Sequence, residues 1–233
     1  MKLGFISFYF GRKKLTNQVS EIIQRLKEEY PDVRCELDYQ TPLQLLVATV
    51  LSAQTTDKQV NKVTAKMFAD CPDLDAFLKL TKEEIKGYIH TLGFYNAKAD
   101  HLYLLFRQLA SDFNGEVPRT MEELTKLSGV GRKTANVVMS NAFGVPAIAV
   151  DTHVFRVSNR IGLAQADTVE KTEQQLMEVI DRDLWTLCHH LLIFHGRRCC
   201  SARKPNCETC VIREYCKAIT LNNEALTPNQ KEK

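Results

Sequence analysis

Apolar residues recur at every third or fourth position along most of this chain, which is the spacing of one buried face of an α-helix. The first such stripe runs from Val19 to Leu26. Later stripes predict helices over residues 98–113 and 182–195, and Gly196 is the expected C-cap of the second. Strict alternation of apolar and polar residues, the mark of a strand, is convincing nowhere. The pattern therefore predicts an all-α protein with about ten helices.

Residues with capping side chains mark where several of these helices begin. Thr41 precedes Pro42, which suits the first position of a helix, and a very apolar run follows over residues 43–51. In three further places a cap residue is followed three positions later by Glu, the spacing of a capping box. These pairs are Thr81 with Glu84, Thr120 with Glu123, and Asp167 with Glu170.

The composition is that of an ordinary globular protein. Of 233 residues, 44% are hydrophobic and 25% are charged, which excludes a fibrous or wholly disordered chain. The net charge of +3 is too small to identify a polyanionic partner by itself. No apolar stretch reaches the roughly 18 residues that span a membrane, and we expect residues 3–10 to dock on the protein rather than act as a signal peptide. The polar, aperiodic residues 217–233 predict a disordered tail.

Residues 127–135 place two glycines in a short turn between two helical patterns. Gly129 and Gly131 permit a tight turn and leave backbone N–H groups uncovered. A turn that enters a helix presents those groups, and the positive end of the helix dipole, to an anion. Apolar residues on both sides would pack the two helices into a hairpin. From the glycines alone, an anion-binding hairpin and a plain helix–helix turn are equally good interpretations.

Two ionisable residues lie in or after this hairpin. Lys133 stands at the start of the second hairpin helix beside Arg132, where desolvation, the neighbouring cation and the helix dipole would favour the neutral, nucleophilic amine. The alternative is a solvated surface lysine. Asp151 ends an apolar run and precedes a new helical segment, so it is a natural N-cap. As a functional residue it would be a carboxylate at the mouth of a cleft, stabilising positive charge or moving a proton.

Five of the eight cysteines lie between residues 199 and 216. Four of them are separated by six, two and five residues, whereas Cys199 falls outside this spacing. Four thiolates in one short loop can enclose a [4Fe-4S] cluster or a tetrahedral zinc ion, and the spacing alone leaves both open. Without a secretory signal, clustered cysteines favour metal binding over disulfides. The four expected ligands are Cys200, Cys207, Cys210 and Cys216.

Taken together, the glycine turn, the segment around Asp151 and the cysteine loop resemble the endonuclease III family of DNA repair glycosylases. All three motifs occur here in order, and the resemblance runs from about residue 36 to Cys216. Residues 51–57 and 92–99 also look like the family's. The resemblance implies a helix-hairpin-helix DNA glycosylase fold, with a six-helix barrel domain, a helical iron-sulfur cluster domain and an active-site cleft between them.

The same resemblance implies a discontinuous domain organisation. An N-terminal segment and helix would pack with the C-terminal domain, and the barrel domain would be inserted between them. The expected parts are residues 1–34 for the N-terminal segment, 35–145 for the barrel with the hairpin at about 120–143, 146–216 for the C-terminal domain with the cluster loop at 200–216, and 217–233 for the tail.

The family's chemistry, carried over to the matching positions, implies a bifunctional DNA glycosylase and AP lyase of base excision repair that removes oxidised pyrimidines such as thymine glycol. Lys133 would attack C1′ of the damaged nucleotide, expel the base and form a Schiff base that permits β-elimination of the 3′ phosphate. Asp151 would assist deprotonation of Lys133 and stabilise positive charge at C1′. A [4Fe-4S] cluster on the four cysteines would be mainly structural.

A glycosidic bond inside a duplex is inaccessible, so the damaged nucleotide must leave the stack. By the same resemblance Gln54 would fill the vacated space and Phe94, larger than the aliphatic wedge common in the family, would insert beside the orphaned base. The alternatives are a polar helix end for Gln54 and ordinary core for Phe94. A basic loop between the first two cluster cysteines would clamp phosphate, unless it is only a solvated loop. The other expected DNA contacts are Gly129, Val130, Gly131, Arg132, His153, Arg203 and Lys204.

Two other interpretations compete. A monofunctional adenine mismatch glycosylase of the same fold usually lacks the lysine and carries a catalytic Glu in the segment matching residues 51–57, where this chain has no Glu. A non-enzymatic DNA-binding module with a four-cysteine zinc site would be colourless, whereas an iron-sulfur protein absorbs visible light. We expect a monomer that binds double-stranded DNA with damaged bases or abasic sites, has no membrane association, and is cytoplasmic (nucleoid-associated if bacterial).

Overall fold

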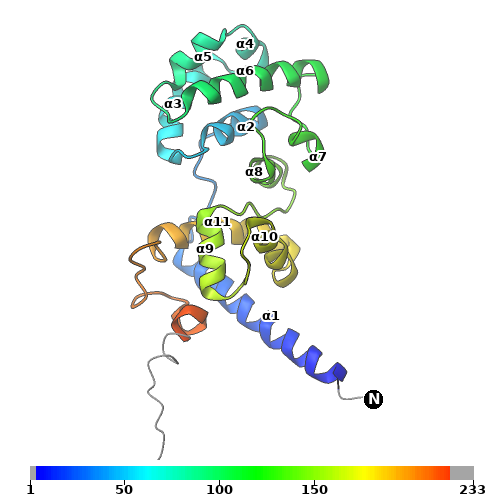
Figure 1. Cartoon of the computed structure of the whole chain (residues 1–233), viewed down its shortest axis with the longest axis vertical. Helices are drawn as coiled ribbons and strands as arrows, with labels where there is room; N and C mark the ends of the chain where they lie inside the picture. The colour runs from blue at the N-terminus through cyan, green and yellow to red at the C-terminus, as the bar shows by residue number, and fades with distance from the viewer. Residues whose placement is uncertain (1–3, 221–233) are drawn as a thin grey trace, which may run out of the picture. The chain divides into compact units, whose positions relative to one another are not determined.

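A computed structural model describes the backbone of residues 4–220 and the side chains of residues 17–220. Throughout this range the regular structure is helical, which confirms the all-α prediction (Figure 1). No helix in the described range combines the length and apolar character needed to cross a bilayer. The helices are α1 (Gly4–Glu29), α2 (Pro42–Leu51), α3 (Asp57–Asp70), α4 (Leu74–Leu78), α5 (Lys82–Ile89), α6 (Tyr95–Asp112), α7 (Met121–Leu124), α8 (Arg132–Phe143), α9 (Thr152–Ile161), α10 (Val169–Val179) and α11 (Trp185–Arg198), with 3₁₀ turns η1 (Arg182–Leu184) and η2 (Arg213–Tyr215).

The chain divides into two compact units. The first unit is Cys35–Ala149 and contains α2 to α8. The second unit joins Met1–Arg34 to Val150–Lys233 and contains α1 and α9 to α11. The hairpin and the loops after α2 and before α6 therefore belong to the first unit, and the cysteine loop belongs to the second.

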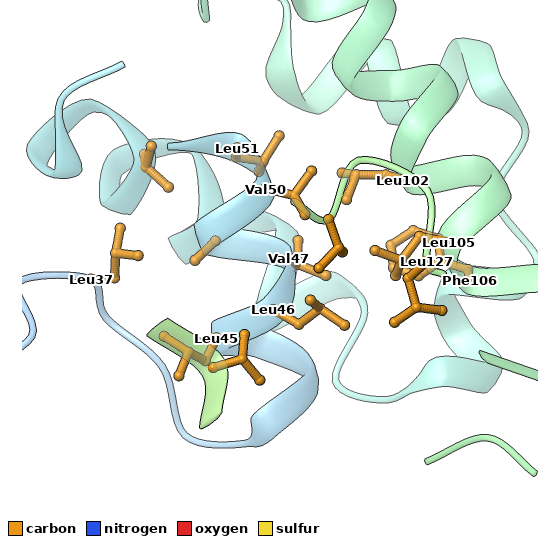
Figure 2. Close-up of a cluster of buried hydrophobic side chains, with 14 of the residues drawn as sticks. Leu37, Leu45, Leu46, Val47, Val50, Leu51, Leu102, Leu105, Phe106 and Leu127 are labelled. Atoms are coloured by element: carbon orange, nitrogen blue, oxygen red, sulfur yellow. The ribbon is translucent and has the colours of Figure 1, made fainter. Parts of the chain in front are cut away.

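Helix α2 is central to the first unit because its sequence is apolar on every side. Thr41 caps it as predicted, with its hydroxyl accepting a hydrogen bond from Gln44 N–H at 3.2 Å. All of residues 44–51 are buried, and the helix contacts α3, α6 and α8. Figure 2 shows leucine and valine side chains of α2 near Leu102 and Leu105 of α6. A helix buried on all sides provides a rigid base for the loop that follows it.

Helices α9 and α11 pack against each other in the second unit. Gly196 lies within α11 rather than at its end, because the helix continues to Arg198 and Cys199 is the C-cap. A Cβ atom at position 196 would lie 3.0 Å from the Cβ of His153, closer than ordinary packing allows. The predicted C-cap is therefore wrong. Glycine is needed here for the close approach of two helices, and periodicity in one helix carries no sign of that contact.

The capping predictions are only partly correct. Thr81 and Glu84 form a complete capping box at α5. The hydroxyl of Thr120 accepts from Glu123 N–H at 3.2 Å, which caps α7. The third pair is wrong, because Thr168, one residue after Asp167, caps α10. Asp167 instead accepts a hydrogen bond from Lys171 Nζ at 2.8 Å, so the carboxylate is committed to an ion pair.

The disorder predicted for the tail does not begin at residue 217. Residues 217–220 form a turn of helix in which Ile219 N–H donates to Cys216 O at 3.1 Å. The turn is attached to a cysteine that the tertiary structure holds in place, and four residues are too few for periodicity to reveal. Residues 221–233 lie outside the described residues, as do the side chains of residues 3–10 that we expect to dock on the protein.

Candidate functional site

Helices α7 and α8 form the hairpin around the glycine turn. The apolar residues that flank the turn are buried and belong to the core of the first unit. Helix α7 contacts α8, and α8 packs on α2, so the turn rests on the best-buried helix of this unit. The buried residues of the hairpin include Leu124, Leu127, Val130, Val137 and Val138.

The two glycines of the turn serve different purposes. Gly129 has φ +77°, and a Cβ there would lie 2.9 Å from the Cβ of His101. Gly131 has φ −93°, and a Cβ there would meet no atom within 4 Å. Glycine is therefore required at 129 by the backbone conformation and by packing, whereas nothing inside the protein requires it at 131. The open space at Gly131 lets an external group approach the backbone closely.

The N-terminus of α8 has no side-chain cap. Gly131 is the N-cap residue and has no side chain that could accept from the N–H groups of the first helical turn, which in any helix point out of its end. The N–H of Val130 donates to Leu127 O at 3.1 Å, and the Val130 side chain is buried. Val130 is thus a packing residue of the turn. The uncapped helix end suits a phosphate oxygen, which can accept from several N–H groups and is stabilised by the helix dipole.

Lys133 is the second residue of α8, and its side chain is exposed. The apolar surroundings expected from the flanking sequence do not cover it, because Val137 and Val138 face the core of the unit. Burial within the chain therefore does not desolvate this amine. The exposed side chain of Lys133 starts from the first turn of α8, close in sequence to the helix end that has no side-chain cap.

Asp151 is the N-cap of α9. Its Oδ1 accepts hydrogen bonds from His153 N–H at 2.8 Å and from Val154 N–H at 2.7 Å, which fixes the orientation of the carboxylate. Among the described residues no hydrogen bond ends on Oδ2, and the side chain is half-buried. Capping and chemistry are therefore compatible at this residue, since one oxygen holds the helix while the other is available to a substrate.

Two arginines of α9 hold the backbone of the cysteine loop, and sequence reasoning missed both. Arg156 donates from Nε and Nη2 to Cys200 O at 3.1 and 3.0 Å. Arg160 donates to Ser201 O at 2.7 Å and to Ala202 O at 2.8 Å. Their four-residue spacing places them on one side of the helix, which is the only sign of a shared partner that the sequence contains. Helix α9 thus carries the aspartate at its start and anchors the cysteine loop along its side.

The thiols of the cysteine loop converge on one place. Cys200 Sγ accepts from Arg160 Nη1 at 3.5 Å, and Cys216 Sγ donates to Arg160 O at 3.5 Å. Cys210 Sγ lies 3.6 Å from His195 Nε2. The structure therefore brings three of the four expected ligands to one arginine and one histidine.

The fourth expected ligand, Cys207, lies close enough to the others to affect their ionisation. Burial raises the pKa of Cys216, and the nearby thiols of Cys200 and Cys207 raise it further. Crowded, buried thiols remain protonated unless a cation binds them as thiolates, which is how a metal–thiolate site behaves. The donor set and its placement fit an iron-sulfur cluster held by these four sulfurs.

Cys199 is a fifth thiol at the same place. Its Sγ, the Sγ of Cys210 and one ring nitrogen of His195 lie within 4.8 Å of one another, the one such group found among the described residues. Burial raises the pKa of Cys199 to about 12, and the charge of Cys210 adds to the shift. Proximity alone therefore does not separate Cys199 from Cys200 as a ligand, and only the spacing in the sequence does.

Gln54 and Phe94 occupy two loops of the first unit in the same unusual backbone conformation. Their φ angles are +53° and +58°, which costs about 1–3 kcal/mol at a residue with a side chain. Both side chains are exposed, and Phe94 is 68% exposed, so the alternative of ordinary core is wrong for Phe94. Gln54 lies beyond the C-cap of α2, so it is a loop residue rather than part of a helix end. Strained, exposed residues of this kind are typical of functional sites.

A lysine next to these loops was missed. Lys98 of α6 is buried, and its Nζ donates a hydrogen bond to Thr55 Oγ1 at 2.7 Å. The signal in the sequence is that Lys98 stands four residues before Leu102, on the apolar face of the helix. A charged residue on the buried face of a helix either has a polar partner inside the protein or destabilises the fold.

The remaining expected contacts differ in accessibility. Arg203 and Lys204 are exposed in a loop whose backbone Arg160 holds, so their positions are defined while their charges face solvent. His153 is half-buried, and its Nδ1 lies 3.2 Å from Arg156 Nη2. The arginine orients this imidazole, and a DNA contact by His153 remains a prediction.

Comparison with known proteins places these features in a family. Residues 47–182 match the HhH-GPD superfamily of base excision DNA repair proteins, and residues 200–216 match the iron-sulfur binding domain of endonuclease III. Endonuclease III of Haemophilus influenzae is 48% identical over 196 residues, which cover 84% of this chain and 93% of that protein.

Solved structures agree with the sequence relatives. A non-covalent endonuclease III–DNA complex aligns with a TM-score of 0.84 and 43% identity over 90% of this chain and 98% of that chain. A trapped endonuclease III–DNA covalent intermediate aligns with a TM-score of 0.84 and 43% identity over 89% and 98% of the two chains. The match over residues 200–216 confirms the predicted [4Fe-4S] cluster and answers the question that the cysteine spacing left open.

Replacing each of the two adjacent cysteines separates their roles. We expect Cys200→Ser to lose most of the iron and the broad visible absorbance of the purified protein, because a cluster ligand is removed. Cys199→Ser is the matched control and should retain both, because Cys199 lies outside the ligand spacing and its Sγ already donates to Asn206 O at 3.3 Å. Iron content and the visible spectrum measure the outcome. Loss of colour in the Cys199 variant with retention in the Cys200 variant would reverse the ligand assignment.

Proposed function

The chain belongs to the endonuclease III family within the HhH-GPD superfamily of base excision DNA repair proteins, and we propose that it removes damaged bases from DNA and then cleaves the strand at the abasic site. The observation that carries this proposal is the exposed side chain of Lys133 in the first turn of α8, next to a helix end that has no side-chain cap. A DNA strand bound at this helix end would therefore lie next to Lys133, the proposed nucleophile.

The proposed reaction uses Lys133 as the nucleophile in both steps. Its neutral amine attacks C1′ of the nucleotide, and the bond to the base breaks, with the base taking the electron pair and then a proton. Opening of the sugar ring converts the C1′ adduct into a protonated Schiff base. Loss of a proton from C2′ then expels the 3′ phosphate by β-elimination, which cleaves the strand. The amine must be unprotonated to begin this sequence, and binding of DNA over the exposed lysine would desolvate it.

Asp151 is proposed to act on the charges that this reaction develops. Its Oδ1 is committed to the cap of α9, so Oδ2 would accept a proton from the attacking amine or stabilise positive charge at C1′. A carboxylate held by two backbone N–H groups needs no reorganisation when the charge appears.

Access to C1′ requires the nucleotide to leave the stack. We propose that Gln54 enters the vacated space and that Phe94 inserts beside the orphaned base. Their exposure and strained backbones support these roles, because each side chain projects from a fixed loop rather than packing on the protein. The ring of Phe94 offers a flat face for a base to stack on.

Binding of the DNA backbone is proposed to be local rather than spread over the surface. The backbone N–H groups at the start of α8 would hold one phosphate, while Arg203 and Lys204 of the cysteine loop would contact another. Arg156 and Arg160 hold the backbone of that loop, and Cys200, Cys207, Cys210 and Cys216 would hold the [4Fe-4S] cluster, which would fix the loop further. A few well-placed donors and cations explain DNA binding by a chain with a net charge of only +3.

We propose oxidised pyrimidines in double-stranded DNA, and the abasic sites that they leave, as substrates of a monomeric enzyme. A cytoplasmic location on the chromosome, at the nucleoid in a bacterium, follows from such a substrate. Among the alternatives, the monofunctional adenine glycosylase is disfavoured by Lys133, and the zinc-binding module by the iron-sulfur domain match. Excision from duplexes that carry thymine glycol, 5-hydroxycytosine or uracil would define the lesion preference.

Removal of the amine tests the nucleophile. Lys133→Gln should abolish borohydride trapping on abasic DNA and lower strand cleavage by roughly 10³-fold or more, because no Schiff base can form. Binding to the same DNA should persist, since the backbone N–H groups are unchanged. Lys126→Gln is the control, an exposed lysine of the same hairpin region that pairs with Glu122. Trapping that persists in the Lys133 variant would remove this residue from the mechanism.

Asp151 can be tested without disturbing the helix cap. Asn caps a helix about as well as Asp, so Asp151→Asn should keep the thermal unfolding midpoint while lowering the rate of base removal by roughly 10²- to 10⁴-fold. Asp151→Ala is the matched comparison and should lose the same activity together with about 0.5–2 kcal/mol of stability. A stable, fully active Asn variant would leave Asp151 as a cap only.

The two glycines give a paired test of the hairpin. Gly131→Ala places a Cβ in open space, so it should fold normally but weaken DNA binding by about tenfold or more, equivalent to about 1.4 kcal/mol. Gly129→Ala should lower the unfolding midpoint, because of its positive φ and the contact with His101. Fluorescence anisotropy and thermal unfolding measure the two effects. Unchanged affinity in a folded Gly131 variant would argue against a phosphate at this helix end.

A further inference from the structure

Lys98 is a buried lysine with a single neutral partner. Its side chain belongs to the first turns of α6 and is 4% exposed, and its Nζ donates to Thr55 Oγ1 at 2.7 Å. Among the described residues no carboxylate forms an ion pair with it. Buried lysines are ordinarily paired with a carboxylate, so the isolation of this one requires a reason.

The position is unfavourable for a cation on two counts. Burial lowers the pKa of Lys98, which means that keeping its ammonium charged opposes folding. Lys98 also lies near the N-terminus of α6, where the helix dipole is positive. An apolar side chain of the same length would avoid both penalties. A residue retained against such penalties is a candidate for a functional role rather than a stabilising one.

The contacts of Lys98 join the two strained loops. Thr55 is the residue after Gln54. Its hydroxyl accepts a hydrogen bond from Lys98 and donates one to Ala53 O at 3.3 Å. The backbone N–H of Lys98 donates to Phe94 O at 3.1 Å. This backbone bond is the ordinary i→i−4 bond of the first turn of α6. The side chain of Lys98 therefore attaches the neighbour of Gln54 to the helix turn that begins at Phe94.

A second hydrogen bond links the same two segments. Gln59 Nε2 donates to Thr91 O at 2.9 Å, so the start of α3 is attached to the turn before Phe94. This bond lies at the exposed surface, whereas the Lys98 bond is inside the protein. In the dry interior, a hydrogen bond from an ammonium group is stronger and better directed than one in water.

We propose that Lys98 is a positioning residue that locks the Gln54 loop and the Phe94 turn in register, so that both side chains enter the base stack together. This inference rests on the proposed function, because it assumes that Gln54 and Phe94 insert into DNA. Lys98 acts through Thr55 and touches neither the substrate nor Lys133. Its contribution is to the unstacking of the damaged nucleotide rather than to the chemistry at C1′.

The test separates unstacking from chemistry. Lys98→Met keeps the length of the side chain and removes the donor. We expect it to slow unstacking, followed by 2-aminopurine fluorescence beside a lesion in a duplex, and to lower single-turnover base excision by roughly 10- to 100-fold. Borohydride trapping on an abasic site in a single strand should be unchanged, because no stack has to be filled there. Lys82→Met, an exposed lysine of α5 that pairs with Asp100, is the control.

Variants at Thr55 make the test independent of how Lys98→Met folds. Thr55→Val removes the acceptor and should reproduce the effect on unstacking, whereas Thr55→Ser keeps the hydroxyl and should behave as the parent protein. In the double variant Lys98→Met/Thr55→Val the losses in unstacking rate should not add, because both substitutions remove the same hydrogen bond. Additive losses, or wild-type unstacking in the folded Lys98→Met and Thr55→Val variants, would overturn the inference. Absence of trapping by the parent protein on any abasic DNA would instead contradict the proposed function.

Discussion

Every helix N-terminus leaves backbone N–H groups that need an acceptor, and helices α8 and α9 meet this requirement differently. Helix α9 supplies its own acceptor, Asp151, and the cap leaves the second carboxylate oxygen available. The N-cap residue of α8 is Gly131, which has no side chain that could accept from these groups. A phosphate can therefore complete the end of α8, and the next residues on that helix include the lysine that attacks the sugar in the proposed reaction.

The groups proposed to contact DNA are attached to rigid supports. Helix α2 is buried on all sides and lies beneath both the hairpin helix α8 and the loop of Gln54. In the second unit Arg156 and Arg160 hold the backbone of the cysteine loop, which the cluster also anchors. The strained conformations of Gln54 and Phe94 persist because such surroundings over-determine them. Because these loops become ordered when the protein folds, DNA binding does not have to supply the entropic cost of ordering them.

Similarity to endonuclease III accounts for the fold, the cofactor and the class of reaction, while the structure gives three individual residues notable surroundings. Phe94 places an exposed aromatic ring at a strained position before α6. Cys199 adds a fifth thiol beside the expected ligands. Lys98 keeps a cation inside the first unit without a carboxylate partner.

Local information in the sequence was sufficient for the helices, for the caps at Thr41 and Thr81, and for the cysteine spacing that identifies a metal loop, because each depends on residues close together in the chain. Tertiary structure decided the rest. It put Gly196 at a helix crossing instead of a helix end, exposed Lys133 and Phe94, and gave Arg156, Arg160 and Lys98 their partners. Periodicity reports which face of a helix is buried, but a partner's position follows only from how distant segments pack.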